Sequence, residues 1–166
     1  LVAILIMAVI AGTAITLFSG VLNSSRKGAD EETAESIKRA ILTYISMTND
    51  TDLSCLDVDE SKDLIAKLSC IIEITDSGVA FTKPANVTDF TKPGDITTGD
   101  SIDASDIKGE FGPFLDASKD MNPKTPGTNG WLIQIDETTQ VVIVTAEEDE
   151  DKCVVTFEPV EEGDGD

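Results

Sequence analysis

The fold is decided by residues 1–48, which read LVAILIMAVIAGTAITLFSGVL (1–22) and then NSSRKGADEETAESIKRAILTYISMT (23–48). The first 22 positions are apolar apart from a few small polar residues, and no ionisable side chain precedes Arg26. A bilayer core of about 30 Å takes roughly 20 helical residues, so we predict a membrane-inserted helix at Leu1–Leu22. A signal peptide is disfavoured because no basic residue precedes the run, and a buried core helix is disfavoured because the run has no polar face.

The second part of this stretch has the period of an amphipathic helix. Apolar residues recur at spacings of three and four, and we expect four of them to pack on a globular head: Ile37, Ile41, Tyr44 and Ile45. No proline occurs before Pro84, so one helix is predicted from about Leu1 to Thr48, roughly 70 Å long at 1.5 Å per residue.

Composition excludes several classes of protein. The 166 residues include 32 acidic and 12 basic side chains, no histidine, and a net charge of −20, which disfavours binding to nucleic acid. Without histidine the chain lacks the commonest general base and zinc ligand, and its three cysteines form no CxxC pair. No GxGxxG or GxxxxGK[ST] phosphate loop occurs. We therefore expect neither an enzyme nor a cofactor.

The remaining chain is predicted to form an acidic α+β head. A short helix is expected from about Asp59, with Asp59 or Ser61 as its N-cap. Runs rich in Val, Ile, Thr and Phe predict strands that form one antiparallel meander, covered on one side by the amphipathic helix. The expected strands are Cys70–Thr75, Gly78–Thr82, Trp131–Asp136, Gln140–Ala146 and Cys153–Phe157.

Between the second and third of these strands lies a long loop, residues 83–130. It is rich in Pro, Gly, Asp and Thr, and a loop of this length usually serves function or surface display. Four apolar side chains are expected to pin it to the sheet: Phe90, Phe111, Phe114 and Leu115.

The sequence of the head suggests two candidate features, a calcium site and a disulfide. Asp100, Asp103 and Asp106 are candidates for calcium, although no EF-hand pattern exists and a solvated acidic loop is the favoured interpretation. A disulfide between Cys55 and Cys70 would close a short loop across the predicted helix. A Cys70–Cys153 bond and three reduced thiols remain as alternatives.

The segments LVAILIMAVIAG and LFSGVLNSSRKGADEETAESIKRAILTYI resemble the N-terminal helix of mature type IV pilins, over about residues 1–48. The resemblance implies a pilin fold, in which a long helix, apolar and then amphipathic, packs on a small antiparallel β-sheet head. Pilins of this family also carry an aromatic first residue and a nearby glutamate, which this sequence lacks. Either the first few mature residues are missing, or the chain is an atypical subunit. A removed basic leader would place the body outside the cell, whereas Arg26 and Lys27 alone favour a cytoplasmic C-terminal side.

The resemblance also implies a function and partners. The chain would be the subunit of an extracellular helical filament at the cell surface, with adhesion, motility or DNA uptake as class roles. It would sit in the cytoplasmic membrane before assembly and meet a prepilin peptidase and the pilus assembly machinery. A secretion-system pseudopilin and a monomeric, membrane-anchored extracytoplasmic binding domain are the alternatives.

Three regions follow from this interpretation: 1–25 as membrane anchor and filament core, 26–50 as the helix that packs on the head, and 51–166 as the extracellular head. Small residues in the first region would let neighbouring helices approach closely. The expected filament-core positions are Leu1, Ile4, Ala8, Ala11, Gly12, Ile15, Leu17, Phe18 and Gly20.

Overall fold

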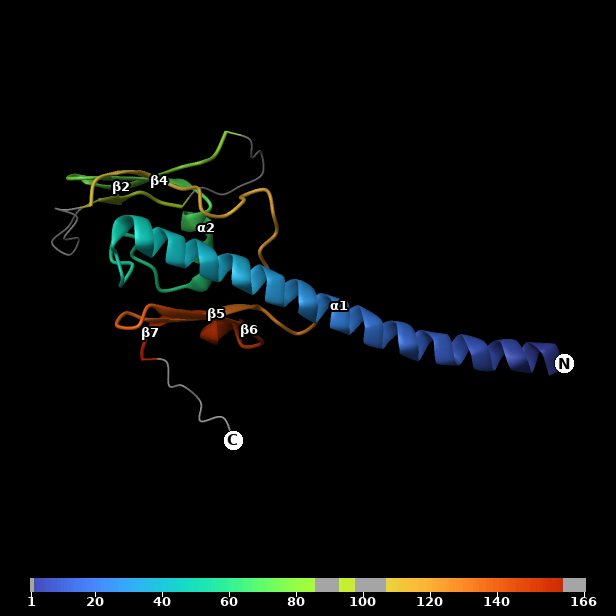
Figure 1. The fold of residues 1–166 in the computed structure, drawn as a ribbon. Helices are drawn as coiled ribbons and strands as arrows, with labels where there is room; N and C mark the ends of the chain where they lie inside the picture. The colour runs from blue at the N-terminus through green and yellow to red at the C-terminus, as the bar shows by residue number, and fades with distance from the viewer. Residues whose placement is uncertain (1, 86–92, 98–106, 160–166) are drawn as a thin grey trace.

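The computed structural model describes residues 2–85, 93–97 and 107–159, and for residues 2–19 it describes the backbone alone. The chain is an α+β protein with a long N-terminal helix and a small head (Figure 1). Its elements are α1 (Val2–Thr48), α2 (Ser61–Leu68), β1 (Ile71–Thr75), β2 (Gly78–Thr82), β3 (Ile96–Thr97), β4 (Gly109–Phe111), β5 (Gly130–Asp136), β6 (Val141–Glu147), the 3-10 helix η1 (Glu150–Lys152) and β7 (Val155–Phe157).

The single long helix predicted for residues 1–48 is confirmed. α1 runs for 47 residues without interruption at Gly20 or Gly28, and its N-terminal half extends away from every other element (Figure 1). It ends at Thr48 and is followed by Asn49, whose φ of 61° lies in the left-handed region and whose N–H donates to the carbonyl of Ile45 at 2.7 Å. Asparagine tolerates this conformation better than most residues, which explains why the helix stops there.

From Gly20 onward, where side chains are described, no helix combines the length and the apolar character needed to cross a bilayer. Most of the segment for which the sequence predicts membrane insertion, Leu1–Leu22, lies outside those residues.

The expectation of one antiparallel meander is wrong, because the strands form two separate sheets. One sheet has the order β3-β2-β1-β4 with antiparallel neighbours, and the other has the order β6-β5-β7. β5 pairs with β6 antiparallel and with β7 parallel. After β6 the chain crosses to the far edge of β5 through η1, so β7 runs in the same direction as β5.

The two sheets lie on opposite sides of a middle layer made by the C-terminal part of α1 and by α2 (Figure 1). The four α1 residues expected to pack on the head are all buried: Ile37, Ile41 and Tyr44 at 0% exposure and Ile45 at 3%. A helix enclosed on two sides needs an apolar surface wider than a single stripe, and Ala40 is buried beside them.

The sheets present their inner faces to this layer through alternating residues. Ile72 and Ile74 of β1 and Ile133 and Ile135 of β5 are fully or almost fully buried. The ring of Phe114 meets that of Tyr44 edge to face, with centroids 5.8 Å apart. One continuous core therefore joins both sheets to the helix.

The long segment 83–130 is more structured than expected. It contributes β3 and β4 to the first sheet, and β4 pairs with β1 across more than thirty residues of sequence. Phe114 and Leu115 do pack against the core, while Phe90 lies outside the described residues.

The predicted N-cap of the second helix is also wrong. Glu60 occupies the N-cap position of α2 without a side-chain capping bond, and the hydroxyl of Ser61 donates instead to the carbonyl of Cys153 at 3.1 Å. This bond and the antiparallel β-bridge between Glu60 and Val154 together tie α2 to the segment before β7.

Candidate functional site

The most unusual surface of the molecule is the part of α1 that leaves the head. We call Val2–Ala29 the stalk. All ten residues from Gly20 to Ala29 are exposed, and Asp30 is the first buried residue after Gly20, where the described side chains begin. Val21 is 69% exposed and Leu22 45% exposed, so large apolar side chains face water on the described part of the stalk. Two adjacent large apolar side chains in water make this part of the stalk a candidate interaction surface.

Hydrogen bonds from Lys124 and Thr125 to the carboxylate of Asp30 hold the base of the stalk against the head. We call these three residues the collar. Asp30 Oδ1 accepts from the backbone N–H of Lys124 at 2.5 Å. Asp30 Oδ2 accepts from the N–H and the hydroxyl of Thr125 at 2.9 and 2.5 Å. These bonds join α1 to a loop more than ninety residues away and set the point at which the helix emerges.

The charge of Asp30 is favoured by this arrangement. Burial opposes ionisation, but the hydrogen bonds from Thr125 and Lys124, aided by the charge of Lys124, together hold the pKa of Asp30 below its ordinary value. The carboxylate is therefore ionised throughout the neutral range, as a triple acceptor should be.

Replacing Asp30 with asparagine is expected to loosen the collar. The amide group would present N–H donors to Thr125 in place of an acceptor, so we expect a loss of about 1–3 kcal/mol and faster hydrogen exchange at the amides of Lys124 and Thr125. Because the folded pKa is lowered, the loss should be full above pH 4 and shrink as pH falls through that pKa. Denaturant unfolding of the full chain in detergent at several pH values measures this.

The matched control is Glu31→Gln, which removes a neighbouring exposed carboxylate from the same helix turn. The proposed role of the collar would be contradicted if both variants lost the same free energy of unfolding. It would also be contradicted if the loss in Asp30→Asn became larger as the pH falls.

Beside the collar, a groove of about 310 Å³ runs between α1 and β6. Its floor is apolar, and Ala34 of α1, Trp131 of β5, and Val144 and Ala146 of β6 contribute to it. Glu31 stands on its rim and also borders the neighbouring hollow over Val142. An apolar groove thus opens next to the part of the stalk that exposes Val21 and Leu22.

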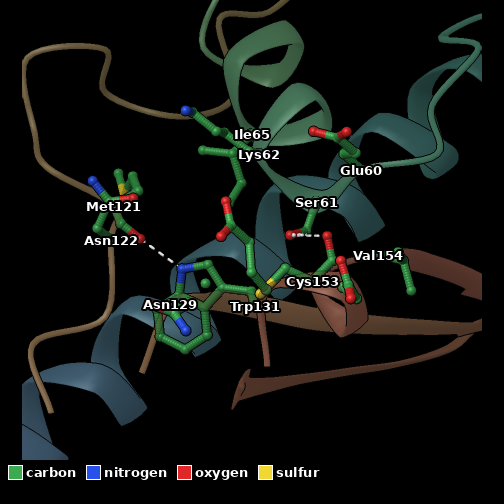
Figure 2. Close-up of a pocket in the computed structure, with 13 residues that line it drawn as sticks. Glu60, Ser61, Lys62, Ile65, Met121, Asn122, Asn129, Trp131, Cys153 and Val154 are labelled. Atoms are coloured by element: carbon green, nitrogen blue, oxygen red, sulfur yellow. Dashed lines mark hydrogen bonds between the residues drawn. The ribbon is translucent and has the colours of Figure 1, made fainter. Parts of the chain in front are cut away.

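A second cavity, of about 520 Å³, also borders Trp131 (Figure 2). The indole N–H donates to the carbonyl of Met121 at 2.6 Å, which holds the loop over the ring. Three acidic side chains, Glu60, Glu150 and Asp151, and one basic side chain, Lys62, line the cavity. The indole itself is only 2% exposed, so it serves mainly as part of the core.

The far end of α1 carries a buried polar cluster around Asp50. Its carboxylate accepts from the Tyr44 hydroxyl at 2.7 Å, from the Cys55 N–H at 3.1 Å, and from the N–H and hydroxyl of Ser54 at 3.0 and 3.1 Å. Burial raises the pKa of Asp50 against these bonds. Burial, and then the charge of Asp50, raises the pKa of Cys55 to about 12, so this thiol is unreactive.

The expected Cys55–Cys70 disulfide is not formed, since Cys55, Cys70 and Cys153 are all free. The two cysteines expected to bond, Cys55 and Cys70, have different hydrogen-bond partners. The thiol of Cys70 donates to the carbonyl of Ala66 at 3.4 Å, at the end of α2, whereas Cys55 lies in the turn organised by Asp50.

The calcium candidates Asp100, Asp103 and Asp106 lie outside the described residues. Within the described ranges, no group of three or more Cys, Asp or Glu side chains is placed to hold a metal ion.

The expected filament-core side chains from Leu1 to Phe18 also lie outside the residues whose side chains are described, and Gly20 is exposed on the stalk. Sequence reasoning missed the collar, the Asp50 cluster and the buried Lys67. The ammonium of Lys67 donates to the carbonyls of Leu56 and Asp57 at 2.7 and 3.0 Å. Nothing in the local sequence around Asp30, Asp50 and Lys67 indicates that these charged side chains are buried.

Comparisons with protein-family models, curated proteins and solved structures give no match to this chain.

Proposed function

We propose that this chain is the structural subunit of an extracellular helical filament of the type IV pilus kind, assembled through its N-terminal helices. The observation that carries the proposal is the stalk. α1 continues beyond the head as a helix that is exposed from Gly20 to Ala29, and the sequence of that extension is uncharged up to Ser25. An apolar helix in water is driven to bury its surface, and lipid before assembly and other copies afterwards would both bury it.

The collar supports the same role. Since Asp30 ties α1 to the head just where the stalk begins, head and stalk keep a constant relative direction, which a regular filament needs. Small residues in the apolar segment, such as Ala8, Ala11 and Gly12, would allow close packing of neighbouring stalks. Equivalent contacts repeated head to tail give an open assembly, and open assemblies make fibres.

The charge distribution fits a filament with an apolar interior and an acidic exterior. Residues 30–166 contain all 32 acidic and ten of the 12 basic side chains, a net charge of −22, while residues 1–29 carry only Arg26 and Lys27. A strongly acidic exterior keeps neighbouring fibres apart in solution. We place the filament at the cell surface, with the cytoplasmic membrane and the pilus assembly machinery as partners before assembly. The function proposed is structural, with no catalytic step.

The proposal is tested by shearing fibres from cells that express the chain and identifying their main subunit. The sharpest variant pair is Val21→Asp and Val141→Asp, two identical substitutions at exposed valines, one on the stalk and one on β6 of the head. A carboxylate buried in a filament core costs several kcal/mol, so Val21→Asp should reduce fibre yield by about 100-fold or more. Val141→Asp should leave fibre yield close to that of the unaltered chain.

Circular dichroism of both variants in detergent checks that the head is folded. Recovery of the unaltered chain only as detergent-solubilised monomers would overturn the proposal and favour a membrane-anchored binding domain. Recovery only as short assemblies attached to the membrane would favour a pseudopilin.

A further inference from the structure

We propose that the groove between α1 and β6 receives the stalk of a second copy of this chain, with Leu22 on the apolar floor and Arg26 beside Glu31. This inference rests on the proposed function, since it names the surface on which one subunit holds the next.

The groove has the chemistry that an apolar helix would fill. Its floor is formed by Ala34, Trp131, Val144 and Ala146, and it opens at the level where the stalk leaves the head. Its volume of about 310 Å³ is enough for one large aliphatic side chain and part of the turn that carries it.

The described part of the stalk offers the matching side chains on one face. Leu22 is 45% exposed, and Arg26 lies four residues further on, which places the two side chains on the same side of the helix about 6 Å apart along its axis. Val21 is a quarter of a turn away and remains available for contacts with other stalks.

Charge complementarity selects the occupant. In a chain of net charge −20, Arg26 and Lys27 are the only charged residues before Asp30. Neither of them forms an ion pair with any carboxylate in the described ranges, and Glu31 likewise has no basic partner there. Glu35, by contrast, is already paired with Arg39 at 3.2 Å. An unpaired cation on an apolar helix and an unpaired carboxylate on an apolar groove are complementary, and both are present in every copy.

A direction of docking follows. If the incoming stalk runs parallel to α1 with Leu22 at the level of Lys27, its Arg26 reaches the level of Glu31, because both pairs are four residues apart. The aliphatic part of Lys27, which borders the groove, would then cover Leu22 while its ammonium stays in water. The contact is heterologous, so each copy gives its stalk to one neighbour and its groove to another.

The test is a charge swap in fibres made by the full chain. Arg26→Glu and Glu31→Lys each create a like-charge contact and should raise the subunit concentration needed for assembly by roughly tenfold. The double variant restores an opposite-charge pair and should return assembly to near the unaltered level. The matched control, Glu32→Lys, changes the neighbouring exposed carboxylate, which does not border the groove, and should have little effect.

A second measurement reports position directly. With Cys153 replaced by serine, the double variant Leu22→Cys/Lys27→Cys, whose two positions lie at the same level in this register, should give a ladder of disulfide-linked oligomers on a non-reducing gel, while each single variant should stop at dimers. Within one chain these two positions are five helical residues apart, about 7.5 Å along the axis and on different sides of the helix, so they cannot bond to each other.

The two levels of the proposal fail differently. If the unaltered chain makes no fibres, the filament function itself is wrong. If it makes fibres but the charge swap gives no recovery and no ladder forms, the filament stands and this groove is not the docking surface.

Discussion

Replacing Asp50 with alanine is expected to remove about 2–4 kcal/mol from the stability of the head, one of the two largest effects we predict. The carboxylate is 4% exposed and accepts four hydrogen bonds. Without it, the hydroxyl of Tyr44 and the N–H of Cys55 would stay buried with no acceptor. Chemical unfolding of the full chain in detergent measures the loss.

Tyr44→Phe removes the hydroxyl that donates to Asp50. A double-mutant cycle of Tyr44→Phe and Asp50→Ala then gives the interaction free energy between the two side chains. Because both substitutions break the Tyr44–Asp50 bond, their combined cost should be clearly smaller than the sum of the single costs. Strictly additive costs would show that the 2.7 Å bond contributes nothing.

The pH dependence of Asp50 should have the opposite sign to that of Asp30. Burial raises the folded pKa of Asp50 above the ordinary value of 3.8, so its contribution to stability is complete at pH values below 3.8 and declines as pH rises through the folded pKa. The cost of Asp50→Ala should therefore be larger at acidic pH than at neutral pH, whereas the cost of Asp30→Asn becomes smaller.

Replacing Ile41 with alanine is expected to cost about 2–5 kcal/mol. The side chain is fully buried in the middle layer, and neither sheet can move inward without disturbing the other side of α1. Relaxation of the cavity is therefore limited, which favours the upper part of the range. The midpoint of denaturant unfolding reports this cost.

Met47→Ala is the matched control on the same helix, because Met47 is 57% exposed. Its cost should stay within about 0.5 kcal/mol. Similar midpoints for the two variants would mean that α1 is not held between the sheets as described.

Local patterns accounted for the helices and strands because their physical causes are local. The absence of proline before Pro84 and the three-and-four spacing from Ala34 to Thr48 predicted α1 to within one residue of its observed ends. The runs rich in Val, Ile, Thr and Phe predicted β1, β2, β5 and β6 to within one residue at each end, as Cys70–Thr75, Gly78–Thr82, Trp131–Asp136 and Gln140–Ala146. In each case the signal lies within a few residues of the element itself.

Some residues of the candidate site could likewise be predicted from local sequence, and others could not. The four apolar residues of α1 that reach the core could be named from their spacing, whereas the collar could not, because its hydrogen bonds join residues 94 and 95 positions apart. Nothing near Asp30 distinguishes it from Glu31 or Glu32, yet it is buried and they are exposed.

By itself, then, the sequence determined the long helix, the uncharged first 25 residues and the strongly acidic body, because periodicity, length and charge are properties of contiguous residues. Only the tertiary structure decided that the strands divide into two sheets around α1, that β7 runs parallel to β5, and that Asp30 holds the base of the stalk beside an apolar groove. These features depend on which distant surfaces meet when the core closes, and many pairings would satisfy the same local patterns. The physical reason is that burial acts on the whole chain at once, whereas a sequence pattern reports one segment at a time.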